Sequence, residues 1–282
     1  MNAIEIVNLS KTYGKIRALN NMNLEVPEGA IYGLVGPNGS GKTTLIKTLI
    51  GSARPGAGYA LVLGLSPIKD KWQLRRQIGY MPQSPALYDD LSARENILFF
   101  GKAQRVANLH QKTAELLSFT GLANRADDLV RTFSGGMKKR VSLCCALVHK
   151  PRILLLDEPT AAVDPQLKQM MWLMFKKLAG SGITIFISTH QMDEALLCDK
   201  VTIIRNGEIV AVDTPQNILQ RGKTQLKVVV DGQENVSEIG STTKDLAEEL
   251  RKFGLHANVY SIELHSENIE EIVLSIIQEK EE

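Results

Sequence analysis

The chain has 282 residues, of which 44% are hydrophobic, so it is long enough for one large domain and a smaller one, each with a buried core. Its 33 lysines and arginines against 31 aspartates and glutamates give a net charge of +2, which argues against a dedicated nucleic-acid-binding protein, because such proteins carry a strong basic excess. No apolar run approaches the roughly 20 residues that span a bilayer, and the first residues lack the pattern of a signal peptide, so we predict a cytoplasmic chain that does not insert into lipid by itself.

The first predicted elements lead into a glycine-rich loop. Residues 4–35 alternate apolar and polar positions with turn residues between them, which predicts antiparallel strands, and residues 30–35 are typical of a short buried strand. The next residues fit the spacing of a phosphate-binding loop, and residues 43–50 after them predict a helix. The loop comprises Gly36, Pro37, Asn38, Gly39, Ser40, Gly41, Lys42, Thr43 and Thr44.

This loop predicts a binding site for a nucleoside triphosphate. Its glycines allow successive backbone N–H groups to turn inward toward phosphate oxygens, and the helix N-terminus adds about half a positive charge at the same place. Lys42 is expected to reach the β- and γ-phosphates, and Thr43 to place its hydroxyl on Mg²⁺. The loop does not indicate what the nucleotide is used for, because kinases, GTPases, helicases and transport motors share it.

Alternating strands and helices follow, as expected of an α/β protein. Ser92 is the expected cap of the helices within residues 92–120, and Asn206-Gly207 is the expected turn of a hairpin over residues 201–212. The other predicted elements are a strand at 59–63, helices at 135–149 and about 166–179, and strands at 153–156 and 183–188.

Two acids end one of these strands. Four apolar residues, 153–156, precede Asp157 and Glu158, which places both carboxylates at the edge of the sheet where ligands of open α/β sheets bind. Asp157 is expected to hold Mg²⁺, directly or through water. Glu158 is expected to accept a proton from an attacking water or to polarise it.

Ser134-Gly135-Gly136 opens the helix that precedes this strand. With this motif the chain resembles the ATP-binding-cassette ATPases, the nucleotide-binding subunits of ABC transporters. The exposed N–H groups, the serine hydroxyl and the helix dipole converge there on one point that suits an anion. Met137 stands where most family members carry glutamine. The basic residues 138–140 after it resemble the drug-export-type branch, although the triplet could also be only the solvated face of the helix.

The resemblance covers about residues 2–220 and implies roles for further residues. Tyr13 matches the aromatic residue that stacks on adenine, and Gln83 matches the glutamine that reaches Mg²⁺ and the attacking water. Asp164 matches an aspartate that contacts the opposite subunit, and His190 matches the histidine that contacts the γ-phosphate. Catalysis is thereby expected from Glu158, His190, Lys42 and Gln83. The metal ligands are expected to be Thr43, Gln83 and Asp157, and the remaining loop and signature residues are expected to bind ATP.

The predicted fold class is α/β, a phosphate-loop NTPase cassette with a mixed sheet core, an antiparallel β subdomain and a helical signature subdomain. The pattern changes near residue 221, which predicts an ATP-binding domain over 1–221 and a small C-terminal α/β accessory domain over 222–282. In the second part we expect a strand at 226–230, a polar stretch, a helix at 243–253, a strand at 257–264 and a helix at 268–278.

The resemblance implies an ATPase that drives a membrane exporter. Two copies, or one copy and a paired ATPase subunit, would form a head-to-tail dimer with ATP between the phosphate loop of one chain and Ser134 of the other. A transmembrane permease partner is expected to dock near residues 83–104 and to hold the chain on the cytoplasmic face of the membrane. A soluble cassette ATPase acting on the ribosome or DNA, and a regulatory module with little hydrolysis, are the alternatives. The transported substrate is not readable from this sequence.

Overall fold

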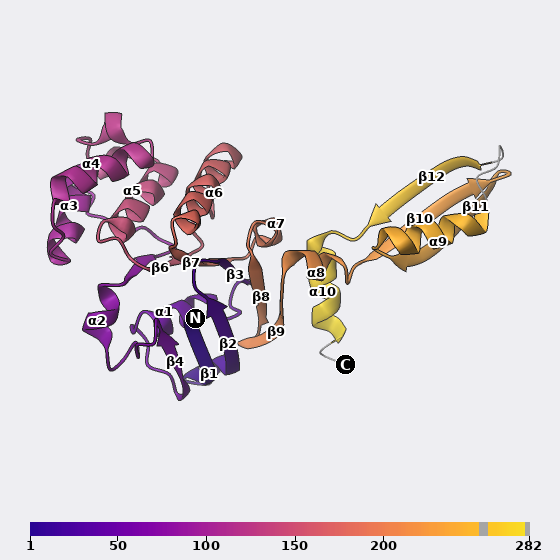
Figure 1. Ribbon diagram of the computed structural model, residues 1–282, viewed down its shortest axis with the longest axis horizontal. Coiled ribbons are helices and arrows are strands. Elements are labelled where there is room, and N and C mark those ends of the chain that lie inside the picture. Colours follow the sequence, from indigo (N-terminus) through magenta and orange to yellow (C-terminus); the bar gives the residue numbers. More distant parts are fainter. Residues whose placement is uncertain (254–258, 280–282) are drawn as a thin grey trace.

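The structure is a computed structural model, and it describes residues 1–253 and 259–279. Figure 1 shows one small sheet below the larger sheet, a group of helices above it and a second small sheet at the right. The fold class predicted from the sequence is confirmed, because a mixed sheet, an antiparallel sheet and a helical group are all present. None of the helices in the described part of the chain combines the length and apolar character that crossing a bilayer requires.

A six-stranded sheet carries the core in the order β5-β6-β7-β3-β8-β9. Its strands are β3 (Ile31–Val35), β5 (Ile78–Met81), β6 (Ile153–Asp157), β7 (Thr184–Thr189), β8 (Lys200–Arg205) and β9 (Glu208–Asp213). All pairs are parallel except β8 with β9. Strands β3, β6 and β7 are buried along their whole length, which explains their continuous apolar runs. The predicted hairpin is present, with Asn206 and Gly207 both at positive φ in its turn.

A separate antiparallel sheet has the order β2-β1-β4. Its strands are β1 (Asn2–Tyr13), β2 (Ile16–Pro27) and β4 (Ala57–Val62), so the antiparallel subdomain stands apart from β3, which joins the larger sheet. Helix α1 (Lys42–Leu49) follows β3 and lies between the two sheets, and the short helix α2 (Lys71–Arg75) comes before β5. Ile4, Leu45 and Phe186 belong to one continuous apolar cluster, which joins both sheets to α1.

Three helices form the helical group: α3 (Ala93–Ala103), α4 (Leu109–Phe119) and α5 (Gly135–Leu147). Two short 3₁₀ turns, Ala123–Arg125 and Val130–Thr132, connect α4 to α5. Ser92 caps α3 and exchanges hydrogen bonds with Glu95, as the sequence predicts. The group has its own apolar cluster, which includes Ile97, Leu117 and Val141.

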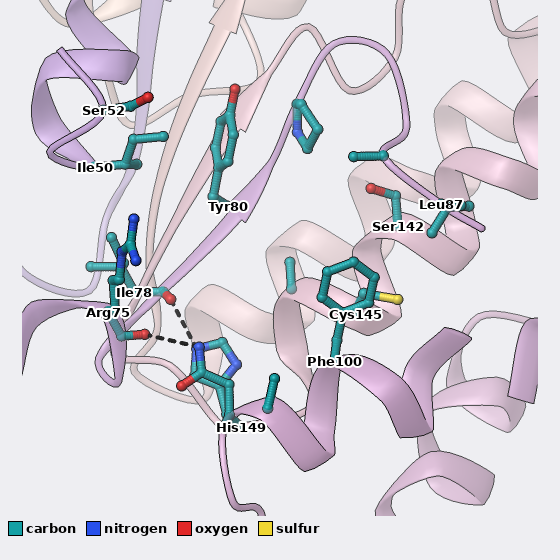
Figure 2. A pocket seen from close by; sticks show the side chains of 15 residues that line it. Ile50, Ser52, Arg75, Ile78, Tyr80, Leu87, Phe100, Ser142, Cys145 and His149 are labelled. Atoms are coloured by element: carbon teal, nitrogen blue, oxygen red, sulfur yellow. Dashed lines mark hydrogen bonds between the residues drawn. The ribbon is translucent and has the colours of Figure 1, made fainter. Parts of the chain in front are cut away.

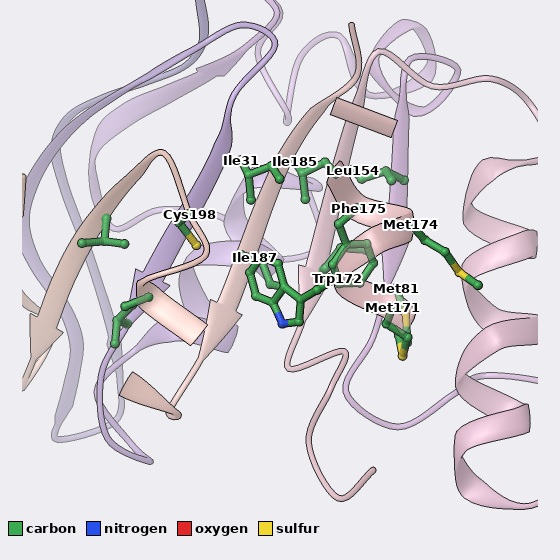
Figure 3. Close-up of a cluster of buried hydrophobic side chains, with 14 of the residues drawn as sticks. Ile31, Met81, Leu154, Met171, Trp172, Met174, Phe175, Ile185, Ile187 and Cys198 are labelled. Atoms are coloured by element: carbon green, nitrogen blue, oxygen red, sulfur yellow. The ribbon is translucent and has the colours of Figure 1, made fainter. Parts of the chain in front are cut away.

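A second apolar cluster covers the opposite face of the six-stranded sheet (Figure 3). Helix α6 (Pro165–Gly180) supplies Trp172 and Phe175, whose rings pack edge to face with their centroids 5.7 Å apart. The short helices α7 (Met192–Ala195) and α8 (Pro215–Leu219) complete this side. Strand residues such as Ile185 and Ile187 contribute from the sheet, so the sheet is buried between two apolar layers.

The last part of the chain forms a third sheet with the order β11-β10-β12. Its elements are β10 (Lys223–Val230), β11 (Gln233–Gly240), α9 (Thr243–Phe253) and β12 (Val259–Ser266). The sequence predicts only a polar stretch between the strand at 226–230 and the helix at 243–253, whereas the structure has the strand β11 there. Most side chains of β11 are exposed on the sheet edge, so the strand lacks the apolar alternation that signals a half-buried strand. Residues 257 and 258 of the predicted strand lie outside the described residues.

Helix α10 (Ile269–Glu279) leaves this third sheet and returns to the first part of the chain, beside α8 (Figure 1). Its Ile272 and Val273 are buried in the same apolar cluster as Trp172. The neck between the two parts is closed by paired hydrogen bonds between Lys223 and Glu267. The boundary at 221/222 stays a prediction, and α10 packs on the cassette side of it.

We expect Phe175→Ala to lower the free energy of unfolding by about 3–5 kcal/mol, because Phe175 is fully buried and its removal leaves a cavity. Leu173→Ala, two residues away on α6 but largely exposed, is the control and should change stability by less than about 0.5 kcal/mol. Urea titration followed by circular dichroism measures both values. Equal effects of the two substitutions would contradict the assignment of this core.

Candidate active site

The loop between β3 and α1 can follow its path only with glycine at two positions. A Cβ on Gly36 would lie 2.3 Å from the carbonyl oxygen of Ile204 and 2.9 Å from Ser40 Oγ. Gly41 has φ of 108° and would place a Cβ 2.5 Å from the carbonyl oxygen of Ala18. The loop therefore lies tightly against β2 and β8, and its backbone curls as the motif predicts.

A cavity of about 380 Å³ opens over this loop. It is lined by residues of the loop and α1, by three residues of β2, and by Gln83 and Glu158. The hydroxyl of Ser40 is buried and has no hydrogen-bond partner among the described residues. Ser40 is not among the residues that line the cavity, so this hydroxyl lies inside the loop, next to Gly36.

The carboxylate of Glu158 is where the predicted catalytic residues meet. Lys42 Nζ lies 3.4 Å from its Oε1, Gln83 Nε2 donates to its Oε2 at 3.0 Å, and His190 Nδ1 lies 3.2 Å from the same Oε2. These residues come from the end of β6, the start of α1, the segment after β5 and the segment after β7. The structure therefore brings all four predicted catalytic residues together.

Lys42 is the cation at the centre of this group, and only 4% of its surface is exposed. Its Nζ donates to the carbonyl oxygens of Gly36 and Pro37 at 2.7 and 3.0 Å. Burial lowers the pKa of Lys42, and the neighbouring carboxylate of Glu158 opposes that effect. An ammonium at the edge of this cavity is suited to bind phosphate.

Asp157 precedes Glu158 at the carboxyl end of β6 and is almost fully buried. Ser188 Oγ donates to Asp157 Oδ1 at 2.6 Å, and the backbone N–H of Glu158 donates to Ser188 at 3.1 Å. Burial, aided by the charge of Asp157, raises the pKa of the nearby Tyr80 phenol to about 12. These hydrogen bonds thus join β7 to the end of β6, where the two acids lie.

The expected metal ligands offer only oxygen: the Thr43 hydroxyl, the Gln83 amide and the Asp157 carboxylate. Thr43 and Gln83 line the cavity, whereas Asp157 is buried and is not among its lining residues. The described residues contain no group of three His, Cys, Asp or Glu side chains that could hold a metal alone. Such a sparse set of hard oxygen donors fits Mg²⁺, which is commonly bound by few protein ligands together with phosphates and waters.

The other predicted site residues do not line this cavity. Tyr13 lies half-exposed at the end of β1, with the ammonium of Lys11 4.9 Å from its ring centroid. Ser134 caps α5 by accepting from the N–H of Met137, and Asp164 caps α6 by accepting from the N–H of Leu167. Gly135 and Gly136 stand in the first turn of α5. The roles of these residues in binding ATP stay predictions.

The basic triplet is not simply the solvated face of α5, so that alternative is wrong. Lys138 pairs with Asp89 at 2.7 Å, and Arg140 donates to the carbonyl oxygen of Thr120. Lys139 is buried and donates to the carbonyl oxygens of Glu158 and Ala161. Three consecutive helical residues span only about 200° of the circumference, so the spacing of residues 138–140 does not show which of them is buried.

A second cavity, of about 430 Å³, lies between β5 and the helical group (Figure 2). Tyr80 lines one side, and Phe100 and Cys145 line the other. His149 Nε2 lies 2.8 Å from the carbonyl oxygen of Ile78, and burial lowers the pKa of this histidine. The segment after Gln83 forms the rim of this groove through Ala86 and Leu87, which are among its lining residues.

Residues 19–161, about half of the chain, match the family model described as ABC transporter. The linearmycin resistance ATP-binding protein LnrL of Bacillus subtilis is 33% identical over 98% of this chain and 89% of its own length. The Nod factor export ATP-binding protein I of Burkholderia orbicola is 40% identical over 77% of this chain and 72% of its own length.

A solved structure, a dimeric ATP-binding cassette in a post-hydrolysis state bound to ADP and phosphate, superposes with a TM-score of 0.67. It is 28% identical and covers 75% of this chain and 98% of that one.

We expect Gly36→Ala to weaken ATP binding about tenfold or more, because the added methyl group must displace the carbonyl of Ile204 or the loop itself. Gly180→Ala is the matched control, since a Cβ there meets nothing within 4 Å. Titration with a fluorescent ATP analogue measures both affinities. An unchanged affinity of the Gly36 variant would refute the placement of the phosphates over this loop.

Proposed function

This chain belongs to the ABC transporter family of ATP-binding proteins, and on that premise we propose that it hydrolyses ATP at the Glu158 cluster to drive an exporter. The observation that carries the proposal is the convergence of Lys42, Gln83 and His190 on the carboxylate of Glu158, beside the cavity over the phosphate loop. Three charged or polar partners around one buried carboxylate suit a base that must be held in one orientation.

In the proposed mechanism, Glu158 takes the proton of a water that lies in line with the γ-phosphate. Gln83 orients that water, while Lys42 and His190 stabilise the charge on the transferring oxygens. Thr43, Gln83 and Asp157 would hold Mg²⁺, which would neutralise charge on the β- and γ-phosphates. Tyr13 would stack on adenine, and its exposed ring at the end of β1 supports that role.

The second half of the ATP site would come from another copy of the chain or a paired subunit. Ser134, Gly135 and Gly136 lie outside the cavity and expose a helix N-terminus, which is a suitable anion site for a partner's nucleotide. The similar cassette that is dimeric with ADP and phosphate supports this arrangement. Asp164, at the exposed start of α6, would contact the opposite subunit. ATP then favours the closed dimer, because neither half surrounds the γ-phosphate alone.

Work on a transported substrate would require a transmembrane permease partner. The groove beside Tyr80 and Phe100 offers an apolar docking site for it, and Ile97, one turn of α3 away, is fully buried and belongs to the helical core. The chain would then lie at the cytoplasmic face of the membrane, held by that partner. The names of the relatives, one in linearmycin resistance and one in Nod factor export, support export over action on the ribosome or DNA.

We expect Glu158→Gln to bind ATP and form a stable dimer while kcat falls about 100-fold or more, because the amide cannot accept the proton. Phosphate release measures turnover, and gel filtration with ATP measures the dimer. Glu28→Gln is the matched control, because Glu28 pairs with Arg152 outside the cavity. Turnover close to that of the unmodified chain would rule out Glu158 as the base.

Ser134→Arg, combined with Glu158→Gln, should abolish the ATP-induced dimer, because a large cation replaces the cap at the surface that meets the partner's nucleotide. Ser181→Arg in the same background, at the opposite end of α6 from Asp164, should leave the dimer intact. Gel filtration with and without ATP compares the two. A dimer that survives Ser134→Arg would exclude the composite site.

A further inference from the structure

Lys139 connects the helix that begins at Ser134 to the turn that carries Glu158. It lies in the second turn of α5, and its side chain is almost completely buried. Its Nζ donates to the carbonyl oxygen of Glu158 at 3.1 Å and to that of Ala161. A lysine rarely becomes this buried without such partners, so the side chain has a specific task at this turn.

The turn that Lys139 holds has an unusual backbone. Glu158 has φ of 48° and Ala162 has φ of 56°, a left-handed conformation that residues with a Cβ adopt only at a cost. Within the turn, the carbonyl of Glu158 also accepts the N–H of Ala161 at 3.2 Å. The two bonds from Lys139 therefore close the turn from outside and fix the direction in which the Glu158 side chain leaves the backbone.

The charge of Lys139 fits this place. Burial lowers its pKa, and the carboxylates of Glu158 and Glu194 oppose that effect. Glu194 is fully buried and accepts from the hydroxyl of Thr160 in the same turn. The ammonium thus bridges two carbonyl oxygens, and its charge is favoured by two nearby carboxylates. An apolar side chain of the same length would leave both carbonyl oxygens without this donor.

We propose that Lys139 is a positioning residue for ATP hydrolysis: it holds the turn of Glu158 and ties it to α5. The inference rests on the proposed role of Glu158 as the base. Lys139 lies five positions after Ser134, about 7.5 Å along the helix. The helix that presents Ser134 to a second copy therefore also holds the catalytic turn of its own chain, and a shift of α5 reaches Glu158 through Lys139.

The test compares Lys139→Met, Lys139→Arg and Lys138→Met in the full-length chain. For Lys139→Met we expect kcat to fall about tenfold or more, because small misplacements of a catalytic group are costly, while the KM for ATP changes less than about twofold. Lys139→Arg keeps donors and should recover most of the rate. Lys138→Met loses only the surface pair with Asp89 and should match the unmodified chain.

A second measurement separates positioning from general destabilisation. In the Glu158→Gln background, Lys139→Met should cause no further loss of the residual rate, because two residues that act through one group are not additive. A full additional loss there, an unchanged kcat of Lys139→Met, or equal losses in the Lys139 and Lys138 variants would each overturn the proposal. If Lys139→Met does not fold, Lys139→Gln replaces it and should show a smaller loss of kcat at unchanged KM. Absence of hydrolysis by the unmodified chain would instead refute the proposed function.

Discussion

The buried carboxylate of Glu158 is the point on which the arrangement of the site depends. Four segments that are distant in the sequence meet there, and each supplies one partner or one restraint: Lys42 from the phosphate loop, Gln83 from the segment after β5, His190 from the segment after β7 and Lys139 from α5. A buried charge is stable only with such partners, so the loop, the sheet edge and the helical group are held in register by one electrostatic requirement. A shift of any of these segments removes a partner from Glu158.

Most of the fold and the centre of the site could be predicted because their signals are local. A glycine loop between a buried strand and a helix, and acids at the end of an apolar strand, have the spacing that their chemistry requires. The parallel order of the sheet, β5-β6-β7-β3-β8, places those strand ends side by side. Residues 36–44, Asp157 and Glu158 could thus be named from their local signals, whereas Gln83 and His190 were indicated by the resemblance to the ABC ATPases.

Other features could not be predicted because they depend on long-range packing. The burial of Lys139 follows from how α5 packs on the turn after β6, which no local pattern reports. Strand β11 was not predicted, because its side chains are mostly exposed and its sequence therefore lacks the apolar alternation of a half-buried strand. The packing of α10 in the core around Trp172 was not predicted either. The sequence of an amphipathic helix shows that one side is apolar but not which surface that side will contact.

The paired hydrogen bonds between Lys223 and Glu267 join the two ends of the segment that forms the third sheet. Because α8 lies before it and α10 after it, both packed on the cassette, the segment between them is an insertion with two covalent attachments and not a terminal appendage. Gly222 lies directly against Ile272, so the chain leaves and re-enters at neighbouring points. A segment with adjoining ends can be excised or exchanged for another while both anchoring helices stay in place. The two attachments of the third sheet therefore lie at one place on the cassette, between two helices whose apolar side chains belong to the same cluster.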